Sequence, residues 1–135
     1  MNAIKRVLSL GLCALMFVTM LVFPVNAASE TDSATLGAHQ VNVSLYLDQM
    51  ILSSYTKFAG LADYMDVQVA LWRKNASTGA VSKCLDRIDR GEDTTSVSVS
   101  GTSDYGYVHF CADSTHSVTA ENQTWSCSLG RLYAT

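Results

Sequence analysis

Apolar and polar residues alternate along much of the chain, and this alternation constrains the fold more than any other feature. In QVNVSLYLD, residues 40–48, every second residue is Val or Leu. A period of two puts successive side chains on opposite faces, so it predicts a half-buried β-strand. The pattern returns in DVQVALWRKN (66–75), TTSVSVS (94–100), YGYVHFCAD (105–113) and QTWSCSLGRLY (123–133). The chain is therefore predicted to be all-β.

Turn signals separate these strands. ASTG (76–79) precedes a returning strand in AVSKCLDRI, which predicts a hairpin over 67–88. DRGED (89–93) and GTSD (101–104) predict further turns, and STHSVTAEN (114–122) a connection before the last strand. Six strands at this spacing are typical of a sandwich or barrel. We expect a single antiparallel β-sandwich over 39–135, after a loose polar lead over 28–38.

Residues 49–65, QMILSSYTKFAGLADYM, fit two structures. Apolar residues at helical spacing, with Ser53 or Ser54 as the cap, predict a helix. The same segment also fits a strand over 50–56 followed by a loop, which a sandwich would use. Because β-branched residues are scarce here, the sequence leaves both structures open.

The N-terminal segment carries the marks of an export signal. Lys5 and Arg6 precede an apolar run over 7–23, and small residues end the segment at Ala27. This pattern predicts a signal peptide over 1–27, a helix that is cleaved and takes Cys13 with it. The alternative is an uncleaved membrane anchor, but the run is at the short limit for a spanning helix and no basic cluster follows. We expect a secreted, extracellular protein without stable membrane insertion.

The charge of the remaining chain excludes some partners. Without Lys5 and Arg6 it holds seven basic and twelve acidic residues, a net charge near −5. Nucleic-acid-binding proteins usually present a basic face, and no such face is visible in the sequence. Binding to an anionic membrane surface is disfavoured for the same reason.

Three cysteines remain after cleavage, and an odd number leaves at least one without a partner in the chain. If strands 105–113 and 123–133 are antiparallel neighbours, Cys111 can face Cys127, with His109 opposite Leu129. A Cys111–Cys127 disulfide is therefore favoured. A Cys84–Cys111 bridge and three free thiols are the alternatives, the first requiring two strands that are too far apart.

No catalytic or metal motif stands out. His109 and Cys111 lie two residues apart on one strand face, about 6.6 Å, which is too far for a base to activate the thiol. Asp113 with His116, and Asp104 with His109, are the acid–histidine pairs nearest to serines, but no GxSxG motif accompanies them. The charged run DRIDRGED (86–93) predicts a salt-bridged surface turn rather than a calcium loop. We expect no enzyme, cofactor or metal.

Aromatic residues are the remaining candidates for ligand binding. Trp72 and Tyr46 lie opposite the apolar faces of their strands, and Trp125 lies on the last strand. Exposed on a sheet face, such side chains would form a stacking platform for sugar rings or for a partner protein. The alternative for Trp72 is that it covers the second face of a two-sided core.

The strand order and the segment SDYGYVHFCAD (103–113) resemble small secreted bacterial proteins with an immunoglobulin- or fibronectin-type-III-like β-sandwich. Tyr105 and Tyr107, after the GTSD turn, carry the likeness. The chain departs from that pattern at Val108, where a basic residue is usual, and lacks the Trp and paired-Cys spacing of antibody domains. The resemblance implies a fold and a secreted setting, and no catalytic residues.

Together these features predict a secreted, non-catalytic protein that acts by binding an extracellular protein or glycan at or outside the cell envelope. A carbohydrate-binding module using the exposed aromatics is one alternative. A small secreted hydrolase that depends on His109 or His116 is another.

Overall fold

The computed structural model describes residues 27–134, so the predicted signal peptide lies outside the described residues except for Ala27. The described part is all-β, and no helix occurs in it. Its six strands are β1 (Ala28–Leu36), β2 (His39–Leu47), β3 (Ile51–Asn75), β4 (Val81–Thr102), β5 (Tyr107–Ala120) and β6 (Gln123–Tyr133).

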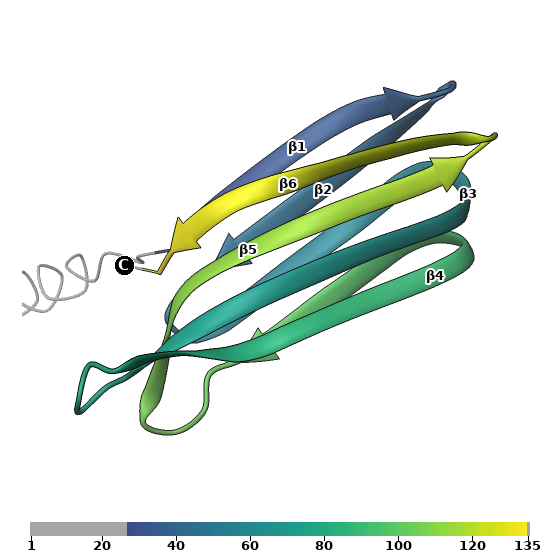
Figure 1. Cartoon of the computed structure of the whole chain (residues 1–135). Coiled ribbons are helices and arrows are strands. Elements are labelled where there is room, and N and C mark those ends of the chain that lie inside the picture. The colour runs from purple at the N-terminus through teal and green to yellow at the C-terminus, as the bar shows by residue number, and fades with distance from the viewer. Residues whose placement is uncertain (1–26, 135) are drawn as a thin grey trace, which may run out of the picture.

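All six strands belong to one antiparallel sheet, ordered β1-β2-β3-β5-β6, with β4 also paired to β3. The first part of β3 pairs with β2 and the end of β4, and its second part pairs with the start of β4 and with β5. Figure 1 shows β3 and β4 doubling back together at one end, which rolls the sheet into a nearly barrel-shaped fold. β1 and β6 lie side by side at the other edge of the roll.

The corner that folds the sheet lies at a register shift between Lys57 and Ala62 in β3, opposite Thr94–Ser96 in β4, and Gly91 comes three residues before Thr94. Gly91 is needed there, because a Cβ atom on it would lie 2.5 Å from Thr94 Cγ2. Asp93 adopts the left-handed conformation, with φ of 49°. The DRGED segment was predicted to be a turn between two strands. It is instead a sharp bend within β4, because the β3 partner bends at the same level.

The core is built by the alternating residues that the sequence indicates. Val41, Val43, Leu45 and Leu47 of β2 are at most 1% exposed. Val97 and Val99, the apolar residues of the TTSVSVS segment, are also buried. Burial of each such side chain stabilises the fold by roughly 1.5–3 kcal/mol. The other buried apolar residues are Leu36, Leu52, Phe58, Ala62, Met65, Val67, Val69, Leu71, Cys111, Ala112, Val118, Ala120 and Leu129.

Residues 49–65, for which helix and strand were both open, belong to β3 from Ile51 onward. Two hydroxyl-bearing residues fill inner positions that β-branched apolar residues would normally take. Ser54 Oγ donates to the carbonyl of Ser44, and Thr56 Oγ1 donates to the carbonyl of Asp66, each at 2.9 Å. Because both hydroxyls have partners, burying them does not break the strand.

The expected loose lead over 28–38 is wrong. Ala28–Leu36 pairs with β2 along its whole length, and Gly37, with φ of 61°, turns the chain into β2. Backbone pairing with an already amphipathic neighbour is enough to order this small, polar segment as an edge strand.

The connection predicted over 114–122 is also wrong, because β5 continues to Ala120. A two-residue turn follows at Glu121 and Asn122, whose φ values of 52° and 60° are typical of a tight hairpin. This turn places Cys111 opposite Tyr133, and Cys127 opposite His116. Five residues of strand therefore separate the two cysteine positions, about 16 Å. The predicted Cys111–Cys127 bridge is absent, and all three described cysteines are free.

Candidate functional site

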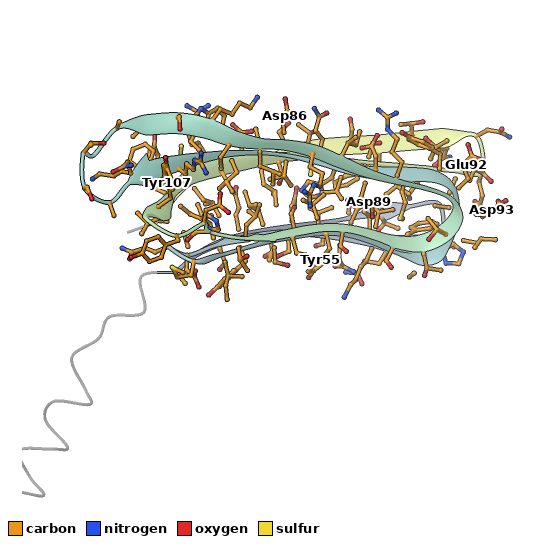
Figure 2. All side chains as sticks on the ribbon, turned by 90° about the horizontal axis from the view of Figure 1, so that it is seen from below. Tyr55, Asp86, Asp89, Glu92, Asp93 and Tyr107 are labelled. Carbon is orange, nitrogen blue, oxygen red and sulfur yellow. The ribbon has the colours of Figure 1, made fainter. Side chains whose placement is uncertain are left out.

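A cavity of about 310 Å³ lies between the two halves of β4. We call it the β4 cleft. Figure 2 shows the two halves of this strand one above the other with side chains between them, joined at Glu92 and Asp93, with Tyr107 toward the opposite end. The lining residues are Leu71, Arg73, Cys84, Leu85, Arg87, Ser100, Gly101, Thr102, Ser103, Asp104, Tyr107 and His109.

The cleft exists because β4 has only one hydrogen-bonded neighbour. Both halves pair with β3, so their other edges face each other across the gap. Near the corner, the gap is bridged by Asp89, whose Oδ2 accepts a hydrogen bond from the Ser98 amide at 2.9 Å. Beyond this bridge the two edges diverge around the cavity.

Arg73 dominates the open end of the cleft. Its Nη1 donates to Asp104 Oδ2 at 2.7 Å, and its Cζ lies 3.9 Å from the centre of the Tyr107 ring. The guanidinium is therefore held on one edge by a carboxylate and on its face by an aromatic ring. Its Nε is the one buried side-chain nitrogen or oxygen in residues 27–134 without a hydrogen-bond partner. Buried donors are normally paired. Because this nitrogen is buried, an acceptor can reach it only if the groups that cover it move aside.

The other walls combine a second cation with apolar surface. Arg87 lines the cleft from the first half of β4, and Leu71 and Leu85 supply apolar surface. His109 is 2% exposed, and its Nδ1 lies 3.1 Å from the carbonyl oxygen of Asp48, which ties β5 to the β2–β3 turn. With two arginines and Asp104, the lining carries one excess positive charge in a chain whose net charge is −3. This local excess favours an anion.

The structure does not bring the three predicted ligand-binding aromatics together. Tyr46 lies on β2, where its hydroxyl donates to Asp48 Oδ2 at 2.9 Å. This bond raises the pKa of Tyr46. Trp125 is partly buried and packs against the core. Trp72 lies on β3, on the opposite side of the strand from buried Leu71.

Trp72 is flanked by cations rather than by other aromatic rings. Arg131 Cζ lies 4.7 Å and Lys83 Nζ 5.5 Å from its ring centre. Arg131 also pairs with Asp113 at 3.3 Å. A second cavity, about 460 Å³, lies over β3, β5 and β6 and is lined mainly by polar side chains: Asp66, Gln68, Thr115, His116, Ser117, Ser126, Cys127 and Ser128.

The two acid–histidine pairs considered for a hydrolase are not formed. His116 is 1% exposed and holds Thr56 Oγ1 on Nδ1 and Ser114 Oγ on Nε2, both at 2.8 Å. Its burial lowers the pKa of the imidazole to about 4. Asp113 pairs with Arg131, and Asp104 with Arg73. Within residues 27–134, no three His, Cys, Asp or Glu side chains converge on a metal position.

The three thiols give a direct test of the β5–β6 register. Cys84 is exposed, Cys111 is buried and Cys127 is half-buried. Burial raises the pKa of each thiol, so all three react slowly in the native protein. We expect iodoacetamide to modify Cys84 first, and to modify all three cysteines in urea without any reductant. Mass spectrometry of the peptides checks this, and a Cys111–Cys127 peptide pair that needs reduction would contradict the register.

Sequence reasoning missed the β4 cleft, although one signal was present. Arg73 continues the inward series of Val67, Val69 and Leu71, so an arginine stands where the pattern expects an apolar residue. Arg87 likewise follows Leu85 at a spacing of two.

No helix in the described residues is long and apolar enough to cross a membrane. No protein-family model matches the chain, and a search of curated proteins finds no significant match.

Proposed function

We propose that this protein is a secreted, non-catalytic binding domain that holds a carboxylate-bearing ligand in the β4 cleft. The export-like N-terminal segment supports the secreted setting. In this proposal the rolled sheet acts as a rigid scaffold that presents a binding site at its edge, as immunoglobulin-like sandwiches do in other secreted proteins.

The unpartnered Nε of Arg73 carries the proposal. Asp104 occupies one edge of the guanidinium, and the edge formed by Nε and Nη2 can donate two parallel hydrogen bonds to a carboxylate once the groups that cover Nε move aside. Tyr107 restricts the plane of the group, so little side-chain entropy is lost on binding. Arg87 adds a second positive charge, and the leucines accept an apolar part of the ligand. At about 310 Å³, the cleft suits a small molecule or a short segment of a larger one.

The first test replaces Arg73 and uses N-acetylleucine as the probe. We expect titration of the ¹⁵N-labelled protein to shift the amide signals of the cleft residues, and Arg73→Ala to weaken binding about tenfold to a hundredfold, because charge-assisted hydrogen bonds are lost. Arg73→Lys keeps the charge but not the two parallel donors, so it should recover only part of the affinity.

Arg131→Ala is the matched control, because Arg131 is also ion-paired and stacked on an aromatic ring but lies outside the cleft. It should bind N-acetylleucine as the unmodified protein does. Equal binding of N-acetylleucine and its amide, or full binding by Arg73→Ala, would remove the proposed site.

A second candidate function is carbohydrate binding beside Trp72. The polar cavity over β3, β5 and β6 offers amide and hydroxyl groups, among them Gln68, Thr115 and Ser126, for the hydroxyls of a sugar. Trp72 lies on the same side of β3 as Gln68 and Ala70, and it is four residues further along the strand than Gln68. Trp72 does not line this cavity, so a sugar that contacts both must extend about 13 Å along β3. Aromatic faces are suitable surfaces for sugar rings.

Trp72→Ala tests this candidate, and Trp125→Ala does not, because Trp125 packs against the core. On an array of cell-wall and plant glycans, we expect a bound glycan to lose about fivefold to a hundredfold in affinity with Trp72→Ala, by the loss of contacts worth roughly 1–3 kcal/mol. The melting temperature should change little, since Trp72 is outside the core. Binding that is unchanged in this variant would exclude the Trp72 surface.

A further inference from the structure

We infer that the ligand of the β4 cleft is an extended peptide segment, which pairs with the free edge of β4 at Ser100 and Thr102 and gives a carboxylate to Arg73. This inference rests on the proposed function and names its ligand class. The carboxylate can come from the C-terminus of the peptide or from an acidic side chain, and the experiment separates the two.

Backbone groups on the second half of β4 point into the gap. In an antiparallel ladder, alternate residues turn their N–H and C=O toward the neighbouring strand and away from it. The amide of Ser103 donates to the carbonyl of Met50 on the β3 side, whereas the amide of Ser98 turns to Asp89 across the gap. By this alternation the N–H and C=O groups of Ser100 and Thr102 also face the gap.

These groups form an edge on which another strand can pair. At Ser98 the edge is already closed by the Asp89 carboxylate, which takes the place that a backbone acceptor would take. Ser100 and Thr102 lie next along the edge, and both line the cleft. Free strand edges recognise extended peptides through main-chain hydrogen bonds, while neighbouring pockets select particular side chains.

The space beside this edge is open. A Cβ atom on Gly101 would meet no other atom within 4 Å, although the residue lies between Ser100 and Thr102 in the wall of the cleft. Leu71 and Leu85 line the same cavity and would contact an apolar side chain of the peptide. Arg73 lines the same cavity and is therefore the cationic end of a partly apolar site that runs along a strand edge.

The edge also explains why a peptide fits better than a free small acid. A small carboxylate satisfies Arg73 alone and leaves the two outward amides of β4 to water. A peptide can pair with Arg73 and with the two outward amides of β4, and its side chains point alternately into the cavity and into solvent. The charged residues of the first half of β4, including Lys83, Asp86 and Arg90, disfavour pairing there with a second copy of this chain.

The test compares four probes on the ¹⁵N-labelled protein. The first is the free-acid mixture, which consists of acetylated tetrapeptides with three randomised positions before a C-terminal leucine. The others are the same mixture as C-terminal amides, the free-acid mixture with N-methylated backbone amides, and N-acetylleucine. We expect the free-acid mixture to bind at least tenfold more tightly than N-acetylleucine, and N-methylation to remove that gain. Cys84 lines the cleft, so a bound peptide should slow its alkylation relative to the free protein, which gives an independent measure of binding. If amidated peptides bind only when they contain Asp or Glu, the carboxylate is a side chain. If they do not bind at all, it is the C-terminus.

Two variants connect the binding to the edge. Ser100→Pro removes an N–H that faces the gap and leaves the β3 ladder intact, so the free-acid peptide mixture should lose most of its tenfold gain in affinity over N-acetylleucine. Gly101→Val fills the cleft and should reduce the affinity for the peptide mixture and for N-acetylleucine. Equal affinities of the peptide mixture and N-acetylleucine, or indifference to N-methylation, would overturn the peptide inference and leave the carboxylate site standing. Failure of every probe to bind would overturn both proposals.

Discussion

Lowering the pH from 7 to 4 is expected to destabilise the protein by about 3 kcal/mol through His116 alone. The folded protein holds this imidazole neutral, because burial lowers its pKa from 6.5 to about 4, although the nearby carboxylate of Asp66 acts in the opposite direction. Below pH 6.5 the unfolded chain binds a proton that the folded chain does not. Stability is therefore fully present above pH 6.5, falls as the pH decreases toward 4, and levels off below it.

Urea unfolding at several pH values between 7 and 4.5 measures this loss. His116→Asn removes the titrating group and should flatten the pH dependence, even if the variant is less stable at pH 7 because Thr56 and Ser114 lose a partner. Measuring the slope separates this effect from the cost of the substitution itself. His39→Asn is the control and should keep the full slope. An unchanged slope in His116→Asn would show that the buried imidazole does not govern acid stability.

Gly91→Val is expected to lower the free energy of unfolding by about 1–3 kcal/mol. The new side chain would start 2.5 Å from Thr94 Cγ2 and 3.3 Å from Val97 Cγ1, at the corner where β4 folds back. Val97 cannot move freely because it is buried in the core, and Thr94 is held by the hydrogen bond that its hydroxyl donates to the Ser96 carbonyl. The corner would have to open, and the two parts of the sheet would separate there.

Gly101→Val provides the matched control for this substitution. It is the same replacement in the same strand, but nothing lies within 4 Å of the new Cβ. Since glycine weakens a strand interior, this variant should be as stable as the unmodified protein or slightly more stable. Urea denaturation of the two variants side by side checks the difference. Equal stabilities would show that close packing at Gly91 does not shape the corner.

The strand content could be read from the sequence because alternation is a local property. The last strand was predicted with the bounds it has, Gln123–Tyr133, since its apolar residues repeat at a spacing of two. The turn before it was missed because Glu121 and Asn122 carry no glycine or proline signal, and both adopt the left-handed conformation. That single omission ended β5 too early and produced the incorrect pairing of Cys111 with Cys127.

The cleft could not be predicted in the same way, because it depends on how far β3 and β4 bend. Arg73 and Asp104 are 31 residues apart, and their ion pair forms only after the sheet has folded over. The period of two that runs through Val67, Val69 and Leu71 extends to Arg73, but it gives no partner for this residue. The aromatic residues were easier to notice, but Trp72, Tyr46 and Trp125 lie in three separate environments.

The shared bend of β3 and β4 has a consequence for how the chain folds and unfolds. Each of these two strands supplies backbone partners to both parts of the sheet, so neither part can lose its hydrogen bonds while the other keeps a complete set. The β3–β4 hairpin can form its backbone hydrogen bonds one after another, starting from the turn at 76–79. Segments that are distant in the sequence are then brought together through successive local steps. The described domain is thus a single cooperative unit, in which the slowest-exchanging amides lie in β3.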